Sequence, residues 1–103
     1  MQICKVVGTV VSTNKAEKLS GLTLLLVRPI DLETFEEKGA PLVSIDTVGA
    51  GPGEVVMTVG GSSSRQTAVT DGKPVDQAVV AIIDHIDMGT KRVFDKTVSG
   101  EGK

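Results

Sequence analysis

The sequence predicts an all-β protein, a small closed or partly closed barrel of five strands with one short helix. β-branched residues gather in short runs, glycine and proline separate these runs, and little of the chain is left for helices. The 103 residues are enough for one domain, whose core must be built from Val, Ile, Leu and Ala because aromatic residues make up only 2%. We place this domain at residues 1–95 and a polar, mobile tail at 96–103.

The strand-like runs follow one another with a turn or a loop after each. The five predicted strands span residues 3–13, 22–32, 42–48, 54–59 and 75–87. Gly8 is expected to be a bulge or a point of close backbone approach in the first strand, and Pro29 places the far half of the second strand at an edge or a bend. The charged loop 33–41 and the glycine-rich segment 49–53 separate later strands. A short helix near residues 62–69 is expected to cap one end, because serine is a good N-cap.

Two of the predicted strands carry apolar residues on both faces. In the second strand, Leu22, Leu24 and Leu26 point one way, while Leu25 and Val27 point the other. The last strand repeats this, with Val79, Ala81 and Ile83 opposite Val80, Ile82 and Ile86. A small barrel has one interior and buries one set, and the other set is costly to leave in water. We therefore expect a neighbouring copy of the chain to cover the outer set, so that the protein works within a symmetric ring.

Composition argues against several classes of function. The net charge of −2 gives no overall attraction for nucleic acid or for an anionic membrane. No stretch approaches the roughly 20 apolar residues of a membrane span, and the N-terminus carries no basic-then-apolar leader. A single cysteine fits a reducing compartment. We expect a cytosolic protein.

The candidate catalytic and metal-binding residues are few. His85 lies between Asp84 and Asp87, but it is the only histidine, and Cys4 is the only thiol. No usual zinc ligand set can be formed from them. We interpret Cys4 as a buried apolar residue and His85 as a structural or surface residue, and expect no catalytic site, metal or cofactor. A small hydrolase that uses either residue is the alternative.

Two glycine-rich segments are candidate ligand sites. Segment 49–53 (GAGPG) lacks the long following helix of a dinucleotide-binding loop, so we interpret it as a tight backbone crossing where side chains would clash. Segment 60–65 (GGSSSR) has three possible roles. It is an anion site, a capped helix start whose Arg65 pairs with a carboxylate, or an interface in which Arg65 meets a partner.

Several motifs in natural order resemble one family. They are MQICKVVGTVVST at the start, LTLLLV, DTVGAGPGEVVMTVGGSSSR (residues 46–65) and PVDQAVVAIIDHID (residues 74–87). Together they are similar to the vertex proteins of bacterial microcompartments, the CcmL/EutN type of carboxysomes and metabolosomes, over residues 1–95. The resemblance implies a five-stranded OB-like barrel assembled as a homopentamer. Such pentamers are expected at the five-fold vertices of a shell in the bacterial cytoplasm, where hexameric facet proteins are the partners.

The resemblance also implies a set of assembly residues. Those that match the family's motifs are Gly49, Ala50, Gly51, Gly53, Glu54, Gly61, Ser62, Ser63, Arg65, Pro74, Asp76 and Asp84. We expect them to act in subunit or facet contacts. The ending IDMGTKRVFDK favours a metabolosome over a carboxysome. The competing interpretation is an OB-type domain that binds single-stranded nucleic acid, which predicts a basic groove with stacking aromatic residues.

Overall fold

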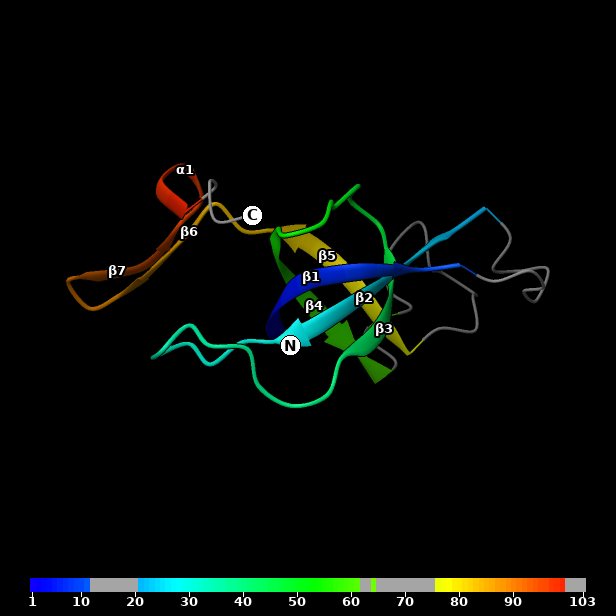
Figure 1. Cartoon of the computed structure of the whole chain (residues 1–103), viewed down its shortest axis with the longest axis horizontal. Coiled ribbons are helices and arrows are strands. Elements are labelled where there is room, and N and C mark those ends of the chain that lie inside the picture. The colour runs from blue at the N-terminus through cyan, green and yellow to red at the C-terminus, as the bar shows by residue number, and fades with distance from the viewer. Residues whose placement is uncertain (12–20, 62–63, 65–75, 100–103) are drawn as a thin grey trace.

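A computed structural model describes residues 1–11, 21–61, 64 and 76–99 of the chain. Five strands form a closed barrel in the order β1-β2-β3-β5-β4, and a separate hairpin extends from one end of it (Figure 1). The barrel strands are β1 (Gln2–Val10), β2 (Thr23–Pro29), β3 (Leu42–Asp46), β4 (Val55–Gly60) and β5 (Gln77–Ile82). All neighbours are antiparallel except β3 and β5, which run parallel. The predicted all-β barrel is confirmed.

The barrel interior is filled by small and medium-sized apolar side chains. The fully buried members of this core are Cys4, Val6, Leu25, Val27, Val56 and Val79. The predicted bulge in the first strand is confirmed, because the pairing of β1 with β2 shifts between Val6 and Gly8. A closed barrel leaves no strand edge free, so the backbone of these five strands is paired on both sides. No helix in the described part of the chain is long and apolar enough to cross a membrane.

The second strand has the two apolar faces that its sequence predicts. Leu25 and Val27 are buried inside the barrel, whereas Leu24 and Leu26 lie half-buried on the outside. On this outer face Leu26 pairs with Gly8 of β1 on one side and with Val43 of β3 on the other. Val43 is 50% exposed, so the outer row is apolar and open to solvent.

The prediction for the last strand was wrong in its boundaries and its faces. The segment forms two strands in different sheets, because β5 ends at Ile82 and a new strand begins at His85. A bulge also shifts the pairing of β5 with β4, so that Val79 and Ile82 both pack toward the barrel core. Each bulge adds one unpaired residue, which turns every later side chain to the opposite face.

The hairpin was not predicted, and we call residues 85–95 the arm. It consists of β6 (His85–Met88) and β7 (Lys91–Asp95), joined by the two-residue turn Gly89-Thr90. Gly89 has φ 64°, which suits a two-residue hairpin turn and is easily adopted by glycine. The arm extends from one end of the barrel, and the molecule measures 46 × 24 × 23 Å (Figure 1). The predicted tail begins with a helical turn, α1 (Lys96–Ser99).

Candidate functional site

Those residues expected to act in assembly that the structure describes lie at two opposite ends of β4. The glycine turn, residues 49–54, leads into this strand, and Gly61 follows it. A strand of six residues spans about 20 Å. The antiparallel β5 carries Asp76 to the Gly61 end and Asp84 to the glycine-turn end. The sequence motifs therefore form two separate groups rather than one surface.

The glycine turn is shaped by one carboxylate and two glycines. Oδ1 of Asp46 accepts hydrogen bonds from the backbone N–H groups of Val48 and Gly49, both at 3.0 Å. Gly49 and Gly53 have φ of 78° and 82°, values that other residues adopt only with strain. The predicted steric reason was wrong at Gly49, where an added Cβ would meet no atom within 4 Å. Glycine is needed there for its backbone conformation.

Glu54 joins the glycine turn to the C-terminal segment. One carboxylate oxygen accepts a hydrogen bond from the Gly51 N–H at 2.5 Å, and the other lies 2.9 Å from Nζ of Lys96. The backbone of the turn is tied to β1 as well, since Val6 donates to the carbonyl of Glu54 and accepts from Gly53. The Gly51 N–H and then the Lys96 ammonium lower the pKa of the Glu54 carboxyl below its ordinary value of 4.5.

Asp84 lies at the same end of the barrel and contributes its backbone. Its carbonyl accepts a hydrogen bond of 2.8 Å from the N–H of Lys96, and the preceding Ile83 donates to the carbonyl of Val55. Lys96 thus contacts Glu54 through its side chain and Asp84 through its main chain. Ala50 packs against the barrel core. This group of predicted residues holds the base of the arm onto the barrel.

The second group lies at the other end of β4 and is described only in part. The N–H of Gly61 donates to the carbonyl of Asp76 at 2.9 Å. The hydroxyl of Ser64, which is fully buried, donates to the carbonyl of Gly61 at 2.6 Å. The remaining predicted assembly residues, together with most of the expected helix, lie outside the described residues: Ser62, Ser63, Arg65 and Pro74. The three possible roles of segment 60–65 remain predictions.

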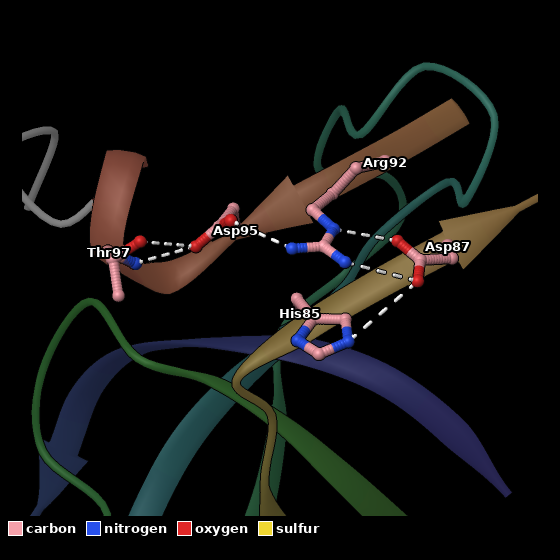
Figure 2. A network of polar contacts seen from close by, with 5 residues as sticks. All are labelled: His85, Asp87, Arg92, Asp95 and Thr97. Atoms are coloured by element: carbon pink, nitrogen blue, oxygen red, sulfur yellow. Dashed lines mark hydrogen bonds and ion pairs between the residues drawn. The ribbon is translucent and has the colours of Figure 1, made fainter. Parts of the chain in front are cut away.

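A network of charged side chains covers one face of the arm, as Figure 2 shows. Nε of Arg92 lies 2.8 Å from one oxygen of Asp87, and Nη1 lies 3.2 Å from Asp95. Asp95 also accepts from the N–H and the hydroxyl of Thr97 at 3.0 and 2.6 Å. The Arg92 guanidinium lowers the pKa of Asp87, and the Thr97 hydrogen bonds lower the pKa of Asp95. Sequence reasoning missed this network, although a Gly-Thr pair between two short alternating runs is a usable hairpin signal.

The opposite face of the arm is apolar at its base. Phe94 forms a second cluster with Ile30 and Val55, and its ring stacks on that of Phe35 with centroids 5.0 Å apart. Phe35 has φ 61°, a left-handed conformation that is unusual for a bulky residue, and the ring contact offsets its cost. These are the only two aromatic residues of the chain. Because each ring covers the other, neither offers the stacking platform that a single-stranded nucleic acid site needs.

The two residues weighed for catalysis are not brought together. Cys4 is buried inside the barrel with its Sγ 3.7 Å from Oγ1 of Thr58, and burial raises the pKa of its thiol. A buried thiol with a raised pKa is a poor nucleophile. His85 lies on the arm, half-exposed, with Nε2 3.8 Å from Asp87. Among the described residues, no group of three or more His, Cys, Asp or Glu side chains is placed to hold a metal ion.

The chain is similar in sequence to the proteins of one known family. The family model described as ethanolamine utilisation protein EutN/carboxysome matches residues 1–84 and ends where the arm begins. The shell vertex protein GrpN of Rhodospirillum rubrum is 47% identical, over 84% of this chain and 97% of GrpN. The carboxysome shell vertex protein CcmL of Synechocystis is 40% identical, over 97% of this chain and 99% of CcmL.

Solved structures agree with these sequence relatives. The structure of Gloeobacter violaceus CcmL covers 94% of this chain and 99% of its own, with a TM-score of 0.88 at 38% identity. The structure of GrpN of Rhodospirillum rubrum is described as that of a pentameric microcompartment shell protein. It covers 85% of this chain and 99% of its own, with a TM-score of 0.77 at 44% identity.

Proposed function

The chain belongs to the EutN/CcmL family, and from that premise we propose that it forms homopentamers that close the five-fold vertices of a bacterial microcompartment shell. The role is structural rather than catalytic, and the shell lies in the bacterial cytoplasm. A flat layer of hexagons closes into a polyhedron only where five-fold points replace hexagons. Hexameric facet proteins are therefore the partners of this pentamer.

The observation that carries the proposal is the open apolar row on the outside of the barrel. Val43 and Val7 are exposed there, and Leu26 lies between the strands that carry them. Leaving such a row in water is unfavourable by about 25 cal/mol per Å² of apolar area. An adjacent subunit removes this cost, which gives a physical reason for self-association that does not depend on the relatives.

Native mass spectrometry at micromolar concentration tests the oligomer, and the expected species is a pentamer. In the variant Val43→Asp we expect the pentamer to dissociate while circular dichroism stays that of the folded barrel, because the side chain lies outside the core. The variant Val11→Asp is the matched control, since Val11 is exposed at the end of β1 and lies outside the row. A wild-type protein that remains monomeric would overturn the proposal.

The two groups of motif residues have different roles in this proposal. The glycine-turn group is bonded within the chain, so it acts on assembly by fixing the position of the arm. The group around Gly61 and Asp76 supplies direct contacts to a neighbouring subunit or facet protein, and Arg65 is expected from its motif to contact a partner as well. Replacing Asp76 by Ala is then expected to impair shell closure and leave barrel stability unchanged.

We propose that the shell is that of a metabolosome, on the basis of the segment 86–96. GrpN and EutN, relatives named as bacterial microcompartment shell vertex proteins, fit this proposal, and relatives named as carboxysome shell vertex proteins match the chain as well. Co-expression with hexameric facet proteins of either type, followed by electron microscopy, tests both partner and compartment. Closed shells are expected with metabolosome hexamers. Closure with carboxysome hexamers alone would reverse the assignment.

A further inference from the structure

The tip of the arm carries an apolar side chain with nothing over it. Ile86 and Phe94 pair at the base of the arm and are covered by the cluster around Phe35. Met88, two residues beyond Ile86 on the same strand, is 42% exposed. The apolar face of the arm is thus covered by its own chain at the base and open at the tip.

A bulge in the arm separates its apolar and charged faces. Ile86 pairs with Phe94 and Asp87 pairs with Arg92, so the pairing skips Val93. Arg92 then faces the carboxylates of the network (Figure 2). Phe94 belongs to the apolar cluster at the base of the arm. All the carboxylates of the arm lie in the Arg92 network. Lys91, at the tip beside Met88, has no ion pair among the described residues.

A groove of about 480 Å³ opens on the barrel beside the start of β1. Its apolar lining includes Ile3, Ile30, Leu32 and Met57. The charged residues of its rim are Asp31, Glu33 and Lys38, and Nζ of Lys38 lies 3.9 Å from Asp31. Asp31 already accepts hydrogen bonds from two backbone N–H groups of its own turn. The Glu33 carboxylate has no cation partner in the described part of the chain.

The arm tip and the groove are complementary in polarity and in charge. The tip offers one exposed methionine and Lys91, and the groove offers an apolar floor and Glu33. Neither of these two charged side chains has an ion pair within the part of the chain that the structure describes. The arm points away from the barrel that carries it (Figure 1), so the complementary groove is that of another copy. In a cyclic ring, one patch of each subunit contacts a different patch of the next subunit. The projecting tip of the arm and the groove are two different patches of this kind. A two-stranded hairpin is also marginally stable by itself, which favours a seated arm.

We propose that, in the ring, the tip of each arm seats in the groove of the adjacent subunit, with Met88 against Leu32 and Lys91 beside Glu33. This inference rests on the proposed pentamer and names a contact that builds it. The contact runs in one direction around the ring, so each subunit gives one arm and receives one.

Disulfide trapping tests the contact. The variant with Met88→Cys and Leu32→Cys is oxidised and run on a denaturing gel without reductant. A one-directional contact gives a ladder of covalent species up to five chains. The matched control carries Met88→Cys and Thr23→Cys, because Thr23 is exposed at the other end of β2. The control is expected to stay a single chain, and the buried Cys4 is retained in both variants.

Charge reversal gives a second measurement that needs no disulfide. Lys91→Glu and Glu33→Lys are each expected to raise the concentration at which half of the pentamer dissociates by about five-fold or more. The doubly reversed variant is expected to return toward the wild-type value. Loss of both the ladder and this rescue, with a wild-type pentamer in native mass spectrometry, would overturn the seated arm and leave the vertex function standing. A monomeric wild-type protein would overturn the vertex function itself.

Discussion

The barrel and the arm are stabilised in different ways. In the barrel, each of the five strands pairs on both sides, and six fully buried residues fill the interior. In the described part of the chain, β6 and β7 pair only with each other. The arm is held by a few contacts at its base, chiefly the stack of Phe94 on Phe35 and the bridge from Lys96 to Glu54. The barrel therefore supports its own fold, whereas the arm depends on its base and, in our proposal, on a neighbouring subunit.

The largest expected effect comes from opening a cavity in the barrel. Leu25 is 1% exposed, and Leu25→Ala is expected to lower the free energy of unfolding by about 3 to 5 kcal/mol. Urea denaturation at a fixed protomer concentration measures this, because assembly adds to apparent stability. Val11→Ala is the control, since Val11 is 92% exposed and should change the value by less than about 0.5 kcal/mol. Equal losses in the two variants would refute the description of the core.

A smaller and more local effect is expected from the base of the arm. Phe94→Ala removes the stacked ring and is expected to cost about 3 kcal/mol, the low end for a buried phenylalanine, with the loss confined to the arm and the Phe35 loop. Hydrogen exchange should show faster exchange at the Lys96 N–H, which bonds to Asp84, and unchanged protection where β1 pairs with β4. If barrel protection fell equally, the two regions would be one cooperative unit.

The smallest effect is expected from the bridge between Glu54 and Lys96. Glu54→Gln keeps the shape of the side chain, removes its charge, and should cost less than about 1 kcal/mol at neutral pH because the pair is partly exposed. The pKa of Glu54 is lowered in the folded state, so its contribution is complete above pH 4.5 and is lost as the pH falls below that value.

Denaturation curves between pH 7 and 3 measure this contribution. The wild-type protein should lose more stability on acidification than Glu54→Gln. Glu36→Gln is the control, because the Glu36 side chain has no ion pair among the described residues. A pH profile of Glu54→Gln identical to that of the wild-type protein would show that the bridge does not hold the arm.

The sequence by itself determined the main architecture, because the barrel strands depend on local patterns of apolar, glycine and proline residues. Alternation in β2 identified Leu25 and Val27 as one face, and the glycine and proline spacing marked the five barrel strands. Composition also argued against a stacking site for nucleic acid. The family resemblance is confirmed by the comparisons, and the pentamer that it implies is described for the relative GrpN.

Only the tertiary structure decided how the last third of the chain is arranged. A run that looks continuous from 75 to 87 breaks at Ile83-Asp84, because Ile83 bonds to Val55 and Asp84 bonds to Lys96. The partners Glu54 and Lys96 are 42 residues apart, so no local pattern indicates their contact. The bulges in β5 and in the arm change which face each side chain takes, and a one-residue shift in pairing has no signal in composition.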